Sequence, residues 1–194
     1  MKELFSNFYD LIMNTIAALG VYGPILGCLL IVLESIFPPL PLFVFITMNF
    51  IAFGKVIGFI ISWICTCIGC LIAYILVKKF LRNFVLRKIR NIDLLTKCLH
   101  YIENLSITKI TVILSIPFTP AFMMNIAAGV SNMSIKKFLP AILISKILLV
   151  YFWGIVGTGL VESFKNPSSL ITVGIMLLIA YITSFLIKKI FKLD

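Results

Sequence analysis

Long apolar runs separated by short polar stretches dominate the hydrophobic pattern of the chain. A helix needs about 20 apolar residues to cross the hydrocarbon layer of a membrane. Three runs reach this length, and they predict spanning helices at 55–77, 134–162 and 168–187. In residues 1–20, apolar side chains recur at helical spacing with polar ones on the other side, which predicts an amphipathic helix in the interface. A short crossing helix is the alternative for this segment.

The apolar run at 21–54 is also long, but prolines interrupt it. Three prolines, Pro38 and Pro41 among them, remove backbone donors and clash with the preceding turn, so the first helix should end just before them. The two arms are too short to cross, which predicts a re-entrant hairpin whose free backbone groups are buried in protein or line a wet cavity. Within this run Glu34 is the only charge, and an acid beside such a break is a candidate for function. The alternative is that Glu34 lies at the interface and is solvated.

A second broken run, at 106–133, repeats this arrangement. The spacing Pro-x-x-Pro-x-Phe occurs in both runs at a constant offset of 79 residues (117 − 38, 120 − 41 and 122 − 43). An asparagine, a glycine, basic residues and a full span follow each proline pair. The second copy has Pro117 and Pro120 at its tip. Asn49 and Gly54 follow the first tip, and Asn125 and Gly129 follow the second. The chain is therefore predicted to be a duplicated unit of broken hairpin and spanning helix.

The charge of the chain is strongly positive and unevenly distributed. Lys and Arg number 17 against 7 acids, which gives a formal charge of +10. Composition is 61% hydrophobic, so this excess indicates cytoplasmic loops and anionic lipid headgroups rather than nucleic acid. The basic linker at 78–105 is predicted to be cytoplasmic. It either clamps anionic headgroups or serves only to orient the protein in the membrane. The basic C-terminus is predicted on the same side. The two hairpins then enter from opposite faces, as an inverted repeat with its site near the midplane.

Lys146 is a second charge inside a predicted span. It lies nine residues after Lys137 (146 − 137), or about 14 Å along a helix, near the middle of a core about 30 Å thick. We expect Glu34, Asn49, Asn125 and Lys146 to line one cavity. The cysteines and the single histidine have no metal-ligand spacing, so the cysteines are interpreted as small apolar residues and no metal is predicted.

At these residues the sequence resembles the DedA family, also known as the SNARE-associated Golgi protein or VTT-domain family. The resemblance covers roughly residues 20–160 and is carried by Glu-Ser-Ile-Phe-Pro-Pro-Leu-Pro at 34–41, Pro-Phe-Thr-Pro at 117–120 and Asn-Ile-Ala-Ala-Gly-Val-Ser-Asn-Met-Ser at 125–134. It implies an all-α membrane protein with two opposed re-entrant hairpins and spanning helices. It also implies that the protein moves lipids across the bilayer.

The chain departs from many bacterial members of that family at three places. Leu114 and Ser115 stand where many members have an arginine before the second hairpin's proline. Phe122 stands in place of an acid after that proline, and Phe43 in place of an acid after the first hairpin's proline. Of the family's buried acids, Glu34 remains. We expect Lys146 to replace the missing arginine as the cation that faces a lipid phosphate.

The resemblance therefore leads us to expect a flippase or scramblase for a phospholipid or undecaprenyl phosphate in the plasma membrane. The predicted lipid-binding residues are Glu34, Pro38, Pro41, Asn49, Pro117, Pro120, Asn125, Gly129 and Lys146. A secondary transporter of an ion or small solute is the alternative. An enzyme is not expected, because no paired-carboxylate or histidine-rich motif occurs. No cofactor and no nucleic-acid partner is predicted, and a homo-oligomer is left open.

Overall fold

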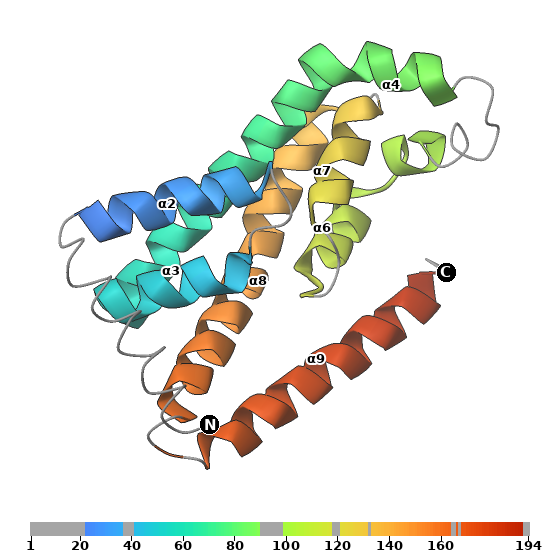
Figure 1. Cartoon of the computed structure of the whole chain (residues 1–194). Helices are drawn as coiled ribbons and strands as arrows, with labels where there is room; N and C mark the ends of the chain where they lie inside the picture. Colours follow the sequence, from blue (N-terminus) through green and yellow to red (C-terminus); the bar gives the residue numbers. More distant parts are fainter. Residues whose placement is uncertain are drawn as a thin grey trace. The chain divides into compact units, whose positions relative to one another are not determined.

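The computed structural model describes residues 22–36, 41–89, 99–117, 121–131, 133–163, 166 and 168–191. Regular structure within these ranges is entirely helical (Figure 1), which confirms the predicted all-α class for this part of the chain. The amphipathic helix predicted at 1–20 lies outside the described residues, and so do Pro38 and Pro120. In chain order the helices are α2 (Tyr22–Glu34), α3 (Leu42–Leu76), the π-helix η1 (Val77–Leu81), α4 (Arg82–Ile89), α6 (Ile107–Ser115), α7 (Ala121–Val130), α8 (Ile135–Ser163) and α9 (Ser169–Phe191).

Both apolar runs are interrupted at their prolines. The helix α2 ends at Glu34, and a turn follows in which Ile36 N donates to Leu33 O at 3.0 Å. The helix α6 ends at Ser115, and Ile116 is extended with φ −72° and ψ 121°. Proline disfavours the helical conformation of the residue before it, so the extended backbone at Ile116 follows directly from Pro117. Each run is therefore a pair of helices joined by a break.

A third interruption divides α3. Gly54 has φ 77° and ψ 171°, which is not helical, so two helical arms meet there. Only glycine adopts such a positive φ without steric strain. The first arm is thus short, whereas the second continues through η1 and α4 to Ile89, past the predicted start of the linker at 78. No proline stands between Lys55 and Ile89 to stop the helix.

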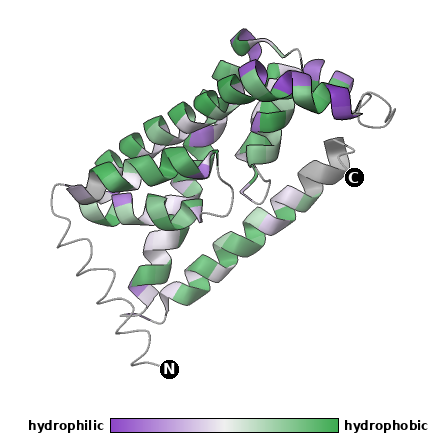
Figure 2. Cartoon of the chain, turned by 45° about the horizontal axis from the view of Figure 1, so that its top comes forward, coloured by the Kyte–Doolittle hydropathy of each residue, from purple (hydrophilic) through white to green (hydrophobic). Residues whose placement is uncertain are grey.

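Two helical stretches of the described chain are long and apolar enough to cross a membrane. They are Leu42–Lys88, with 47 residues, and Ile135–Ser163, with 29. The predicted span at 55–77 falls within the first, and the one at 134–162 coincides with the second to within one residue. The third, at 168–187, overlaps α9, whose apolar part Ser169–Phe185 is shorter than these two stretches. Figure 2 shows the largely hydrophobic colouring of α3, α8 and α9, in contrast to the hydrophilic residues on α4.

The chain forms two compact units, each built from separate segments. The first contains residues up to 31, 41–62 and those from 150 onward; the second contains 32–40 and 63–149. The second unit has a buried apolar core in which the rings of Tyr74 and Phe138 stack at 4.8 Å between centroids. In the first unit, methyl groups added at Gly154 and Gly157 would overlap the side chains of Phe50 and Thr47. These glycines therefore allow α8 to approach the first arm of α3 closely.

Candidate functional site

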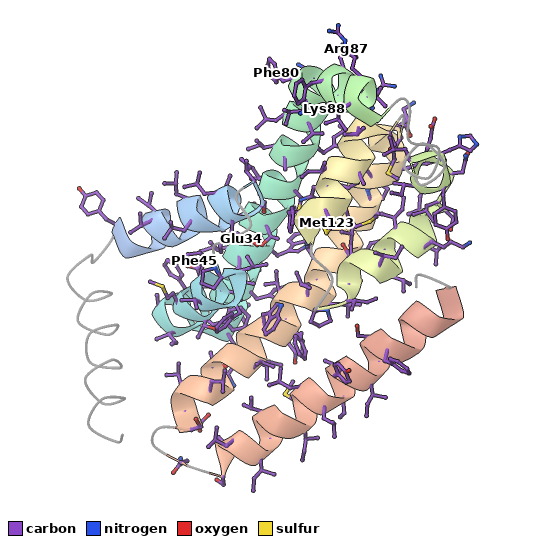
Figure 3. All side chains as sticks on the ribbon, turned by 45° about the vertical axis from the view of Figure 1, so that its right-hand side comes forward. Glu34, Phe45, Phe80, Arg87, Lys88 and Met123 are labelled. Atoms are coloured by element: carbon purple, nitrogen blue, oxygen red, sulfur yellow. The ribbon has the colours of Figure 1, made fainter. Side chains whose placement is uncertain are left out.

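Glu34 and Lys146 lie within electrostatic range of each other in the second unit. Glu34 is the last residue of α2, directly before the break (Figure 3), and Lys146 is near the middle of α8. The Lys146 side chain is completely buried, and Glu34 is half-buried. The carboxylate and the ammonium attract each other electrostatically. The structure thus brings together the two charged residues that the sequence singled out.

The ammonium of Lys146 has unused hydrogen-bond donors. Its Nζ makes no hydrogen bond to any residue that the structure describes, although a lysine carries three N–H donors. An ammonium at the centre of a membrane costs at least about 2.5 kcal/mol on insertion scales. Attraction to Glu34 offsets part of this cost without a direct hydrogen bond. The arrangement leaves a buried cation able to bind an oxygen ligand.

Two contacts fix the position of Lys146 along α3. Trp63 Nε1 donates to Leu143 O at 2.9 Å, and Cys67 Sγ donates to Ile142 O at 3.9 Å. Lys146 is about one turn further along α8, and it acts electrostatically on the Cys67 thiol. Cys67 is therefore a neighbour of the charged pair. The sequence does not indicate this role of Cys67, because the spacing of the cysteines does not show which helix the Cys67 side of α3 contacts.

Gly69 allows the break after α2 to approach α3. A methyl group there would lie 2.6 Å from Ser35 Oγ and 3.1 Å from Val32 Cα, so only hydrogen fits at this position. Gly69 is two residues, or about half a turn, after Cys67 on α3, so this contact places Ser35, the neighbour of Glu34, close to the level of Cys67. Gly69 is a second residue that sequence analysis did not select.

Asn125 on α7 is buried, and its polar atoms are unpaired. Its side chain is 1% exposed, and neither Nδ2 nor Oδ1 has a hydrogen-bond partner among the residues described. One turn later, a methyl group at Gly129 would lie 2.8 Å from Val77 Cβ and 2.9 Å from Tyr74 O. Gly129 therefore has a packing role. The next residue, Val130, accepts a hydrogen bond at its O from Arg82 Nε at 3.1 Å.

Asn49 belongs to the first unit, whereas the other three predicted polar residues belong to the second. Its Nδ2 donates to Ser62 Oγ at 3.0 Å, which joins the two arms of α3 across the kink at Gly54. A methyl group at Gly27 would lie 2.7 Å from Asn49 Oδ1. Asn49 is therefore held by packing and hydrogen bonding within its own unit. Of the predicted proline tips, Pro41 is exposed and Pro117 half-buried.

Two residues of the predicted basic clamp bind the protein's own backbone. Lys78 Nζ donates to Met133 O at 2.8 Å and to Tyr74 Oη at 2.6 Å, while Tyr74 Oη donates to Met133 O at 2.7 Å. Arg82 Nε donates to Val130 O, the last residue of α7. Cations near a helix C-terminus satisfy its free carbonyl groups. Arg82 therefore caps α7, and Lys78 fixes the backbone at Met133 between α7 and α8; the sequence indicated neither role.

The described residues contain no group of three or more histidine, cysteine, aspartate or glutamate side chains that could hold a metal ion. In comparisons with known proteins, the family model of the VTT domain matches residues 39–159. Uncharacterized membrane protein YhjE of Bacillus subtilis (strain 168) is 28% identical over 146 residues, which are 75% of this chain and 70% of that protein. No solved structure matches the chain. The matched family region contains Asn125 and Lys146, and Glu34 lies just before it.

Proposed function

The chain belongs to the VTT domain family, also called the DedA family, and is a membrane protein; from this premise we propose that it moves a lipid with a phosphate-containing headgroup across the bilayer. The candidate substrates are a phospholipid and undecaprenyl phosphate. We further propose that it acts in the plasma membrane with its C-terminus in the cytoplasm. The supporting observation is the buried ammonium of Lys146, which has no hydrogen-bond partner among the described residues and is attracted by Glu34.

A phosphate oxygen would supply the missing partner of Lys146. Lysine binds phosphate as a compact cation with rotatable donors, and it would form charge-assisted hydrogen bonds with the headgroup. When no lipid is bound, Glu34 partly balances the buried positive charge. The buried amide of Asn125, which has no hydrogen-bond partner among the described residues, offers two further donors. In this proposal the headgroup accepts hydrogen bonds from these donors as it crosses, while the acyl chains stay in the lipid.

The helix breaks are consistent with this path. Interrupted backbone at membrane depth is tolerated where it is buried in protein or lines a water-filled cavity. We propose that α2 with the first arm of α3 forms one re-entrant hairpin, and that α6 with α7 forms a second of opposite orientation. Such inverted pairs of broken helices build substrate sites in many transporters.

The decisive experiment is lipid crossing by the purified full-length protein in liposomes. Fluorescent phospholipid and a polyprenyl phosphate are each scored for movement between leaflets, with Lys146→Met, Lys146→Arg and the unchanged chain compared. We expect Lys146→Met to abolish crossing and Lys146→Arg to keep part of it, because both cations bind phosphate. The control is Lys136→Met, which removes an exposed lysine from the same helix.

Normal crossing by Lys146→Met would overturn the role of this residue, and absence of crossing by the unchanged chain for both lipids would overturn the proposed function. Liposomes loaded with an ion-sensitive dye test the alternative solute transporter in the same preparation. Flux of ions without movement of lipid would favour that alternative.

A further inference from the structure

The segment from Lys79 to Lys88 carries exposed aromatic and basic side chains. Phe80 is 74% exposed and Phe84 is 58% exposed, which are high values for side chains of this size. Lys79, Arg87 and Lys88 are also exposed. Figure 3 shows Phe80, Arg87 and Lys88 projecting away from the ribbon of η1 and α4. We call Lys79, Phe80, Phe84, Arg87 and Lys88 together the basic–aromatic face.

The other side of the same segment is fixed to the protein. Both η1 and α4 pack against α7, and Lys78 and Arg82 donate hydrogen bonds to backbone carbonyls at and beyond the end of α7. These inward contacts determine which side chains face outward. The basic–aromatic face is thus presented by an anchored helix rather than by a free tail.

Charge on this segment has one sign. Lys78, Lys79, Arg82, Arg87 and Lys88 lie between Val77 and Ile89 without an acid. Lys88 Nζ lies 4.9 Å from the centre of the Phe84 ring, a cation–π distance that keeps the ammonium beside the aromatic surface. Interleaved aromatic and basic side chains are typical of segments that lie at the boundary of a membrane, where the rings contact the acyl region and the cations contact headgroups.

The position of the face along the chain supports a lipid partner. The apolar arm of α3 after Gly54 runs from Lys55 to Leu76, which is about 33 Å of helix at about 1.5 Å per residue. This is close to the thickness of the hydrocarbon core, about 30 Å. The helix therefore leaves the hydrocarbon near Val77, where the basic–aromatic face begins. Headgroups of the adjacent leaflet are then the nearest partner.

We propose that the basic–aromatic face binds anionic phospholipids of the adjacent leaflet. Arg87 and Lys88 bind the headgroup phosphate, and Phe80 and Phe84 pack into the acyl boundary beneath it. Anionic headgroups are favoured over zwitterionic ones because the face carries cations and no compensating acid. This surface site is separate from the buried Glu34–Lys146 pair, so it goes beyond the proposed transport function.

The test uses the full-length protein with Phe84→Trp in nanodiscs that contain brominated lipid. Quenching of tryptophan fluorescence is measured with brominated phosphatidylglycerol or brominated phosphatidylcholine at equal fractions, and the quenching of the native tryptophans in the parent chain is subtracted. We expect the anionic lipid to quench the added tryptophan about twofold more strongly. The preference should weaken as salt is added, because salt screens exposed charges.

The matched variants separate a specific face from general positive charge. Arg87→Gln with Lys88→Gln should abolish the preference for the anionic lipid. Lys55→Gln with Lys136→Gln removes the same amount of charge from exposed positions outside this face, and this variant should keep the preference for the anionic lipid. Equal quenching by the two lipids, or a preference that persists without Arg87 and Lys88, would overturn the proposal. Absence of quenching by either lipid would place the face outside the membrane, against a soluble partner, and would also overturn it.

Discussion

Glu34 and Lys146 attract each other in the second unit, yet Lys146 Nζ makes no hydrogen bond within the described part of the chain. A structural ion pair in an apolar environment is normally supported by hydrogen bonds that satisfy both charged groups. Within the described residues the cation keeps free donors beside an acid that directly precedes a helix break. For the proposed lipid transport, this relationship favours a ligand site over a pair that only stabilises the fold.

Replacing Lys146 should therefore affect transport more than stability. We expect Lys146→Met to lower the free energy of unfolding by much less than the roughly 3–5 kcal/mol that is lost when one partner of a tightly bonded buried pair is removed. Glu34→Gln should impair crossing while the protein stays folded, because the amide keeps the shape of the side chain. Thermal unfolding and lipid crossing of both variants and of the double variant provide the measurement. A double variant that restores stability lost in Lys146→Met would identify the pair as structural.

Asn125 and Asn49 should respond oppositely to the same substitution. Asn125→Leu removes two polar atoms that have no partner among the described residues, so we expect unchanged or higher stability together with slower lipid crossing. Asn49→Leu removes the hydrogen bond to Ser62 and should lower the free energy of unfolding by about 1 kcal/mol. Denaturation in a matched detergent compares the two. A strong loss of stability in Asn125→Leu, equal to that in Asn49→Leu, would count against a ligand role for Asn125.

Gly129 and Gly174 provide a second matched pair. Gly129→Ala places a methyl group against Val77 and the Tyr74 carbonyl, and we expect destabilisation of about 1–3 kcal/mol from overpacking. Gly174 lies within α9 with no atom within 4 Å of the added methyl, so Gly174→Ala should stabilise by roughly 0.5–1 kcal/mol through helix propensity. Thermal unfolding of both variants tests the packing of α7 on α3. An equal change in unfolding temperature for Gly129→Ala and Gly174→Ala would show that the contact at Gly129 adapts without strain.

The two hairpins should be accessible from opposite sides of the membrane. In a variant without native cysteines that still transports lipid, Tyr22→Cys and Lys55→Cys flank the first hairpin, and Lys109→Cys and Lys136→Cys flank the second. Each of these positions is exposed. We expect an impermeant thiol reagent to label the first pair from one side and the second pair from the other. Labelling of Tyr22→Cys and Lys55→Cys from different sides would show that this segment crosses the membrane and that the inverted repeat is wrong.

Features that depend on the local backbone could be predicted from the sequence. Pro117 forces an extended residue before it, so the position of that interruption follows from residue type. Gly54 only permits the positive φ found there, since Gly58 and Gly69 remain helical in the same α3. The lengths of the apolar runs likewise indicate the long helices, because crossing hydrocarbon requires a minimum number of apolar residues. Glu34 and Lys146 were recognisable as candidates since a charge in such a run is rare and costly.

Contacts between helices could be decided only by the tertiary structure. The sequence does not specify the rotation and register of α3 against α7 and α8, which result from the packing of many side chains together. That packing puts Cys67 beside Lys146, turns Lys78 toward the backbone at Met133, and assigns Asn49 to a different unit from Asn125. Residue type therefore determined where the helices break and which charges stand out, whereas packing across long separations in the chain decided which of those groups share a site.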